Sequence, residues 1–149
     1  ECQFKTPAEA LILASIIEKE TGKSSERAHV SGVFHNRLRL GMPLQSDPTV
    51  SYAVTLGAFV LKRPLSKVDL RKASPFNTYL NKGLPPRPIS NPGLASIRAA
   101  IMPKKTKDIY FVADGKGGHT FSTTLLEHNR NVMMWRKLQR KAHDKNIEN

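Results

Sequence analysis

The chain has 149 residues, of which 39% are hydrophobic and 24% are charged, a composition typical of one soluble globular domain rather than a disordered tail. Its single cysteine, Cys2, excludes an intrachain disulfide, a cysteine zinc cluster and a CxxC redox pair, and no apolar run reaches the roughly 18 residues of a membrane span. The net charge of +12 indicates an anionic partner, such as nucleic acid, anionic lipid or cell-wall peptides, or simply a basic solubilising surface.

Two helices joined by a tight turn are predicted first. Residues 6–9 combine a capping Thr, a Pro at the first helical position and a Glu three residues after the cap, which is typical of a helix start. This helix should continue over residues 10–21 and end at Gly22 in a left-handed conformation. A second helix is expected from residue 24 or 25 to residue 40, where hydrophobic residues recur at helical spacing before Gly41.

The middle of the chain alternates short helices with irregular segments. Asp47 before a proline predicts a capped short helix through about residue 54, and residues 66–69 have the pattern of another capping box. Five prolines within residues 74–92 exclude a central strand and disfavour a helix interior there. Asn91, again before a proline, predicts the cap of a helix that ends before Pro103.

The last part of the chain predicts a hairpin and a long helix. Residues 109–113 and 119–123 have strand composition, and the Asp- and Gly-rich residues 114–118 between them form a turn. A helix should start at about Leu125 and become purely polar after Arg140. We therefore expect an α+β fold, with helices packed around a small, mainly antiparallel sheet that includes this C-terminal β-hairpin.

The first predicted helix places one carboxylate on a hydrophobic face. At about 100° per residue, Glu20 falls in the middle of the face formed by Leu13, Ile16 and Ile17, whereas Glu18 falls on the opposite side. A carboxyl group shielded from water has a raised pKa, as a general acid working near neutral pH requires. The position alone leaves a second interpretation open, in which Glu20 bends toward solvent or pairs with a basic side chain.

Several motifs follow one another along the chain in a fixed order. The first is Leu-Ala-Ser-Ile-Ile-Glu-Lys-Glu-Thr at residues 13–21, and the later ones are Ser25-Glu26-Arg27, Asn36-Arg37-Leu38, Leu44-Gln45-Ser46-Asp47-Pro48-Thr49, Asn77-Thr78-Tyr79, Gly83-Leu84-Pro85-Pro86, Asn91-Pro92-Gly93, Tyr110-Phe111-Val112-Ala113-Asp114-Gly115 and Gly118-His119-Thr120-Phe121. Together they resemble the motifs of the YceG-like family, the endolytic murein transglycosylases. The first resembles that family's catalytic helix, and the matches extend from about residue 8 to residue 135.

The resemblance has implications for how the chain is organised and where it works. It implies that residues 1–149 are a single catalytic domain, cut from a longer protein whose membrane anchor and LysM-like region precede it. The whole protein would be held by a single-pass anchor at the periplasmic face of the bacterial inner membrane, or at the equivalent Gram-positive surface. Peptidoglycan synthases are its expected partners, and nucleic acid is not.

The resemblance also implies an activity. Lytic transglycosylases cleave the β-1,4 bond between N-acetylmuramic acid and N-acetylglucosamine without water and leave a 1,6-anhydro end, which would terminate or trim nascent glycan strands. The catalytic glutamate of the family corresponds to Glu20, and one carboxyl group suffices because it first donates a proton and then takes one back. No cofactor and no metal are implied.

Six polar residues are candidates for contact with a glycan strand. Asn, Gln and Tyr side chains suit hydrogen bonds to sugar hydroxyls and acetamido groups, and a His beside a glycine-rich turn could also reach substrate. Asp47, the second acidic candidate after Glu20, stands before a proline, which favours a role as a helix cap instead. Arg37 or Arg87 could meet carboxylates of the wall. The six candidates are Asn36, Gln45, Asp47, Asn77, Tyr79 and His119.

Two other classes of function compete with this hypothesis. A nucleic-acid-binding module would explain the charge, the basic end of the chain and the pair of short helices near the start, although the basic residues are spread over the whole chain. A non-catalytic scaffold that binds the cell wall is the other alternative. Either protein would be indifferent to a Glu20→Gln substitution.

Overall fold

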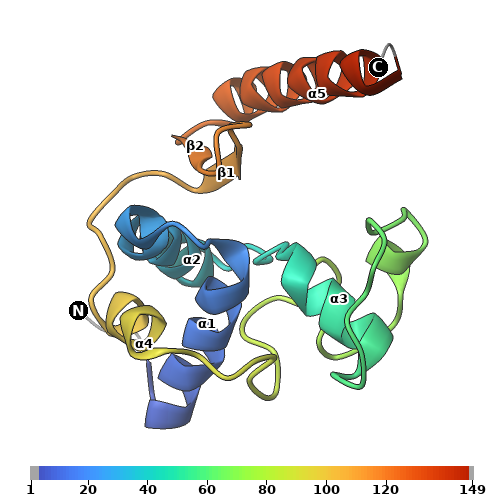
Figure 1. The fold of residues 1–149 in the computed structure, drawn as a ribbon. Helices are drawn as coiled ribbons and strands as arrows, with labels where there is room; N and C mark the ends of the chain where they lie inside the picture. Colours follow the sequence, from blue (N-terminus) through green and yellow to red (C-terminus); the bar gives the residue numbers. More distant parts are fainter. Residues whose placement is uncertain (1–3, 148–149) are drawn as a thin grey trace.

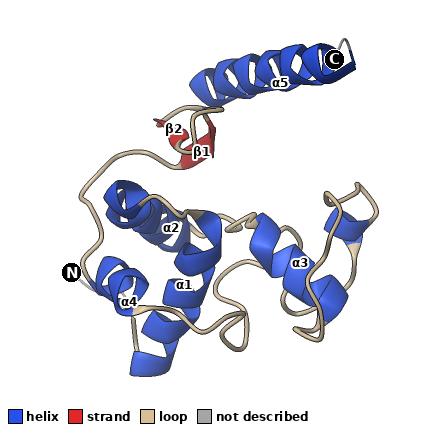
Figure 2. Ribbon diagram, in the orientation of Figure 1, coloured by secondary structure: helices blue, strands red, loops and turns tan. Residues whose placement is uncertain are grey.

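The computed structural model describes residues 4–147. Its helices are α1 (Pro7–Glu20), α2 (Arg27–Leu40), α3 (Asp47–Thr55), α4 (Leu94–Ile101) and α5 (Leu125–Ile147), with short 3-10 turns at Ser24–Glu26 and Asp69–Arg71 and two strands, β1 (Tyr110–Ala113) and β2 (His119–Ser122). Figures 1 and 2 show α1 at the centre, α2, α3 and α4 around it, and the hairpin between these helices and α5. The expected α+β class is confirmed.

The core of the molecule forms around α1. This helix is hydrophobic on most of its surface, and every residue from Ile12 to Ile17 is buried. It packs against α2, α3 and α4, so its last turn is held on several sides. The buried cluster also takes in side chains from the other helices and from the loops, namely Val30, Phe34, Leu44, Ala53, Phe76, Ile89, Ala99 and Ala100.

The two ends of α1 differ in how well the sequence predicts them. At the start, the Thr6 hydroxyl accepts a hydrogen bond from the N–H of Glu9, as expected for a cap. At the end, the prediction of a left-handed Gly22 is wrong, because the backbone already leaves the helix at Thr21 in an extended conformation. The Thr21 hydroxyl accepts the N–H of Lys23 at 3.0 Å, and this local turn replaces the glycine stop.

Helix α2 ends as predicted. Gly41 has a left-handed φ of 66°, and the N–H groups of Gly41 and Met42 bond back to carbonyls of the last turn. The capping box at residues 66–69 is also confirmed: Ser66 and Asp69 exchange side-chain bonds with each other's backbone N–H.

Two other predicted caps are wrong. Asp47 is the first residue of α3 rather than its cap, and the preceding Ser46 turns its hydroxyl away from the helix to Glu20. Helix α4 begins at Leu94 and is not capped by Asn91. The carboxylate of Glu18 serves the start of α4 instead, because it accepts hydrogen bonds from the N–H of Gly93 and the hydroxyl of Ser96.

The hairpin and α5 form a layer of their own. Strands β1 and β2 pair antiparallel from Tyr110 opposite Ser122 to Ala113 opposite His119, close to the predicted bounds. Helix α5 packs on this hairpin and continues well beyond it (Figure 1). Among residues 4–147, no helix has both the length and the apolar character needed to cross a membrane.

Candidate active site

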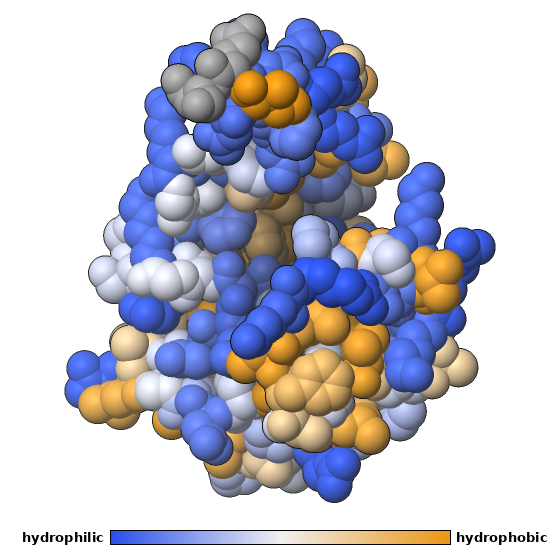
Figure 3. Space-filling view, turned by 45° about the vertical axis from the view of Figure 1, so that its right-hand side comes forward, coloured by the Kyte–Doolittle hydropathy of each residue, from blue (hydrophilic) through white to orange (hydrophobic). Residues whose placement is uncertain are grey.

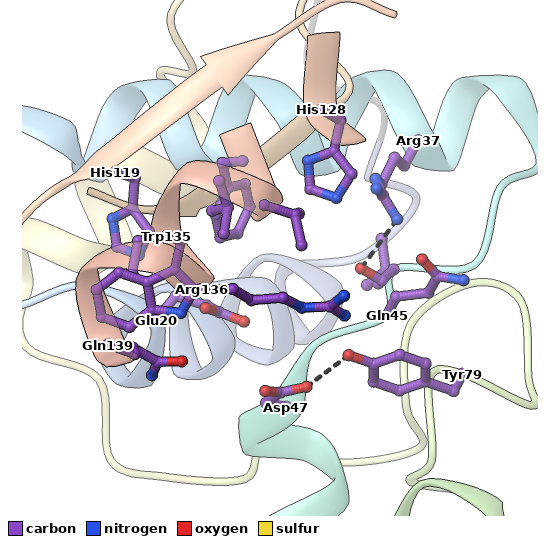
Figure 4. Close-up of a pocket in the computed structure, with 15 residues that line it drawn as sticks. Glu20, Arg37, Gln45, Asp47, Tyr79, His119, His128, Trp135, Arg136 and Gln139 are labelled. Atoms are coloured by element: carbon purple, nitrogen blue, oxygen red, sulfur yellow. Dashed lines mark hydrogen bonds between the residues drawn. The ribbon is translucent and has the colours of Figure 1, made fainter. Parts of the chain in front are cut away.

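A cleft of about 550 Å³ lies between the end of α1, the loop before α3, the hairpin and α5 (Figures 3 and 4). Five of the seven residues expected from the sequence to form the site line it: Glu20, Gln45, Asp47, Tyr79 and His119. The other lining residues are Arg37, Leu44, Phe111, Val112, Ala113, His128, Val132, Trp135, Arg136 and Gln139.

Glu20 is the last residue of α1 and is half-buried. Burial raises the pKa of its carboxyl group from 4.5 to about 7. The hydroxyl of Ser46, which donates a hydrogen bond of 2.7 Å, lowers the pKa, the negative charge of Asp47 raises it, and the positive charge of Arg37 lowers it. Glu20 therefore exists both protonated and ionised near neutral pH.

The two glutamates at the end of α1 have opposite environments, as the helix geometry predicts. Glu18 accepts hydrogen bonds from Ser96 and Gly93, and these bonds lower the pKa of its carboxyl group. Glu18 is therefore ionised at neutral pH and tied to the start of α4, whereas Glu20 faces the cleft.

Arg37 fixes a positive charge in the wall of the cleft. Its buried guanidinium donates hydrogen bonds to the carbonyls of Ile109 (2.6 Å), Pro43 (2.9 Å) and Leu44 (3.4 Å), and it lies 5.2 Å from the ring centre of Tyr110. These bonds hold α2, the loop before α3 and the start of the hairpin together. Burial lowers the pKa of Arg37, but a guanidinium stays protonated in a protein, so its charge persists beside Glu20.

Asp47 and Tyr79 form a pair on the floor of the cleft. The Tyr79 hydroxyl donates a 2.5 Å hydrogen bond to the exposed carboxylate of Asp47, and Figure 4 shows the two side chains pointing toward each other. Burial and the nearby carboxylate raise the pKa of Tyr79, so its hydroxyl keeps its proton. Asp47 is a negatively charged neighbour of Glu20 and not the helix cap that its position before a proline predicts.

The loop before α3 carries local backbone strain. Gln45 has a φ of 50°, a left-handed conformation that is uncommon for residues other than glycine. Two hydrogen bonds hold it there: the N–H of Gln45 bonds to the carbonyl of Thr78, and the N–H of Ser46 to the Thr78 hydroxyl. The strained turn leaves the Gln45 side chain exposed in the cleft and directs the Ser46 hydroxyl to Glu20.

His119 closes another side of the cleft. Its Nδ1 lies 2.8 Å from one carboxylate oxygen of Glu26, and its backbone N–H donates to the other oxygen at 2.9 Å. This double contact ties the hairpin to the start of α2. A Cβ at the neighbouring Gly118 would come within 2.6 Å of the Glu26 carboxylate, so a larger residue there would displace this side chain from His119.

Two of the expected sugar-contacting residues do not line the cleft. The Asn36 amide donates to the carbonyls of Thr106 and Asp108 and accepts from Arg39. The fully buried Asn77 amide likewise donates to two carbonyls, at residues 70 and 72, and accepts the N–H of Tyr79. Both side chains hold loops in place, so the structure favours positioning roles for them over substrate contact.

The sequence analysis missed the wall contributed by α5. His128, Val132, Trp135, Arg136 and Gln139 recur at helical spacing and present one face of α5 to the cleft. Figure 4 shows Arg136 extending from this helix into the cleft. The same spacing on a helix usually indicates a face packed against a core, which is why the pattern did not single out a binding surface. Within residues 4–147, no group of three or more His, Cys, Asp or Glu side chains could hold a metal ion.

Comparison with known proteins gives consistent results. The chain is 46% identical over 120 residues to a Bacillus subtilis protein named endolytic murein transglycosylase, covering 80% of this chain and 32% of that protein. It is 40% identical over 129 residues to a Streptococcus pneumoniae protein of the same name, covering 85% of this chain and 23% of the relative. The chain therefore spans only a third or less of the length of these relatives.

A solved structure agrees with the fold. The crystal structure of a yceG-like protein from Listeria monocytogenes matches with a TM-score of 0.74 and 45% sequence identity, over 83% of this chain and 38% of that chain. The family model of the YceG-like family matches residues 1–134, which include every element from α1 to the first part of α5. This chain therefore belongs to the YceG-like family.

Proposed function

We propose that this chain is the catalytic part of an endolytic murein transglycosylase, which cuts the bond between N-acetylmuramic acid and N-acetylglucosamine within peptidoglycan strands and leaves 1,6-anhydro ends. The observation that carries the proposal is the state of Glu20, a shielded carboxyl group in a cleft, with a pKa of about 7. Such a group holds a proton for part of the time at neutral pH and is a base for the rest.

The reaction needs a single carboxyl group. Protonated Glu20 donates its proton to the bridging oxygen while the bond from that oxygen to C1 of muramic acid breaks. The C6 hydroxyl of the same sugar then attacks C1, and the Glu20 carboxylate takes up the hydroxyl proton. No water is consumed, the new bond closes the 1,6-anhydro ring, and Glu20 returns to its protonated state.

The surroundings of Glu20 suit both halves of this cycle. The Ser46 hydroxyl and the charge of Arg37 stabilise the carboxylate that exists between the two steps, whereas burial and Asp47 favour the protonated form. Gln45 and Tyr79, on the cleft wall, supply polar groups for sugar hydroxyls and acetamido groups. We assign the same kind of contact to His119, and we leave Asn36 and Asn77 outside the binding surface.

The alternatives drawn from charge alone are less well supported. The names of the relatives refer to cleavage of murein, and neither nucleic-acid binding nor a purely structural wall contact accounts for a glutamate with so strongly raised a pKa. Under the proposal, the basic surface attracts the carboxylates of the wall peptides.

The place of action follows from the substrate. Relatives that act on murein work at the cell wall, outside the cytoplasm. We propose that this chain works there too, as part of a longer protein held at the membrane by a segment outside the chain and operating beside peptidoglycan synthases. The chain would then trim or terminate strands as they are made.

The experiment that tests the proposal is mass spectrometry of purified glycan strands after digestion with the 149-residue chain. We expect internal cuts with 1,6-anhydro ends, and a loss of activity of at least a thousandfold in the Glu20→Gln variant. Glu9→Gln is the matched control, because it makes the same change on the same helix at a residue that only serves the helix start. Products with reducing ends would mean hydrolysis by water, and an active Glu20→Gln variant would refute the proposal.

A further inference from the structure

A second cleft lies on the other side of Asp47 and the last turn of α1. It has a volume of about 990 Å³, larger than that of the cleft at Glu20. Its walls come from the last turn of α1, from α3, from the loop at residues 57–65 and from residues 89–91. None of the catalytic steps proposed above uses this cleft.

The two clefts are adjacent. Asp47 lines both of them, Lys19 lines the second and Glu20 lines the first. Successive residues of a helix point about 100° apart, so at the last turn of α1 the Lys19 side chain faces the second cleft and the Glu20 side chain faces the first. A ligand that extends from one cleft into the other therefore passes beside the carboxyl group of Glu20.

The lining of the second cleft combines hydrophobic and polar groups. Tyr52 packs against Phe76 at 4.8 Å between ring centres, which holds the Tyr52 ring in the wall. Phe59 and Val60, on the loop, are 60% and 79% exposed, so the loop presents hydrophobic side chains to solvent. Figure 3 shows hydrophobic and hydrophilic surface side by side on this face of the molecule.

This lining is suited to carbohydrate. A sugar ring has apolar faces made of C–H groups and a polar edge made of hydroxyls, so it binds best where an aromatic or aliphatic surface lies next to polar side chains. The second cleft offers Phe59 and Tyr52 as surfaces, with Lys19, Ser51 and Asn91 as polar neighbours. A purely hydrophobic ligand would leave these polar groups without partners.

We propose that the second cleft binds the continuation of the glycan strand beyond the bond cut at Glu20, with Phe59 as the surface against which a sugar ring packs. This inference rests on the proposed function and extends it. An enzyme that cuts within a strand must hold the strand on both sides of the reactive bond. Because Asp47 lines both clefts, the second cleft lies next to the carboxyl group of Glu20, where the continuation of a bound strand would lie, and this position favours the strand over a partner protein.

The test compares glycan oligomers of increasing length as substrates. For the unmodified chain, kcat/KM should rise with length as the oligomer comes to fill both clefts. For Phe59→Ala, kcat/KM on long strands should fall about three- to tenfold, the size of one lost aromatic contact, mainly through a higher KM. Leu94→Ala is the matched control, because Leu94 is 64% exposed on α4 and lines neither cleft.

A binding experiment separates this inference from the proposed function. Glu20→Gln and the double variant Glu20→Gln/Phe59→Ala are titrated with long strands, and the double variant should bind about three- to tenfold more weakly. Equal binding by both, or an unchanged dependence on length in Phe59→Ala, would overturn the inference even if cleavage is normal. Absence of cleavage by the unmodified chain would contradict the proposed function, and the titration would still decide whether the second cleft holds a strand.

Discussion

The hydroxyl of Ser46 donates a 2.7 Å hydrogen bond to the carboxyl group of Glu20, and the negative charge of Asp47, the next residue, acts on the same group in the opposite direction. The first contact lowers the pKa of Glu20 and the second raises it. Two adjacent residues of one loop therefore set the proton affinity of the proposed catalytic acid, and each can be removed separately.

Removing the Ser46 hydroxyl should make Glu20 a weaker acid. In Ser46→Ala the carboxylate loses its hydrogen-bond donor, so its pKa rises further above the ordinary value. We expect the alkaline limb of the kcat/KM profile, where the acid loses its proton, to move to higher pH. Ser24→Ala, at an exposed serine of the turn before α2 that lines neither cleft, should leave the limb in place. A limb that moves to lower pH would contradict this assignment.

Removing the charge of Asp47 should have the opposite effect. In Asp47→Asn the carboxylate of Glu20 no longer faces a negative neighbour, so its pKa falls and the alkaline limb moves to lower pH. The Tyr79 hydroxyl still finds an acceptor in the Asn side chain, which keeps the local geometry. The measurement is the same pH profile, and an unshifted limb would mean that Asp47 has no electrostatic role.

The raised pKa of Glu20 predicts that the proposed catalytic residue destabilises the fold. Its pKa is about 7 in the folded chain against 4.5 as the ordinary value, so folding takes up a proton between these pH values and stability falls as pH rises through this window. We expect Glu20→Gln to be more stable than the unmodified chain above pH 7, by roughly 1 to 3 kcal/mol.

The pH dependence of this gain in stability provides the control for its electrostatic origin. Below pH 4.5 Glu20 is protonated in both the folded and the unfolded chain, so the gain should shrink toward zero. Urea unfolding at pH 4 and at pH 8 measures both values. Equal stability of the two proteins at pH 8 would argue that Glu20 is well solvated.

Asn77 should matter for stability rather than for substrate binding. Asn77→Ala removes a fully buried amide and leaves the carbonyls of residues 70 and 72 and the N–H of Tyr79 without these partners, which should cost about 2 to 4 kcal/mol. Asn81→Ala, which removes two bonds at an exposed residue, should cost about 1 kcal/mol or less. Urea unfolding gives both values. A raised KM in a fully stable Asn77→Ala variant would instead support direct contact between Asn77 and the sugar.

The sequence predicts the parts of this structure that depend on near neighbours. Helix periodicity located α1 and α2, strand composition located the hairpin, and the angular position of Glu20 separated it from Glu18. The family resemblance then identified the same glutamate.

The predictions that fail concern helix ends and surfaces that residue patterns alone do not settle. Gly22 does not stop α1, because a local turn at Thr21 ends the helix first. Asp47 is the first residue of α3 rather than its cap, and Glu18, from a different helix, serves the start of α4 in place of Asn91. The wall formed by α5 could not be predicted either, because a periodic face on a helix does not reveal whether it covers a core or an open cleft. Nor does a motif reveal whether a polar side chain such as Asn77 points outward or inward.

Titration of the Glu20 side-chain carboxyl carbon by NMR measures directly whether this group holds a proton near neutral pH. Comparison with Glu20→Gln assigns the signal, and we expect a midpoint near pH 7. A midpoint near 4.5, the ordinary value for a glutamate, would contradict it, because the carboxyl group would then hold almost no proton to give to a glycosidic oxygen at neutral pH.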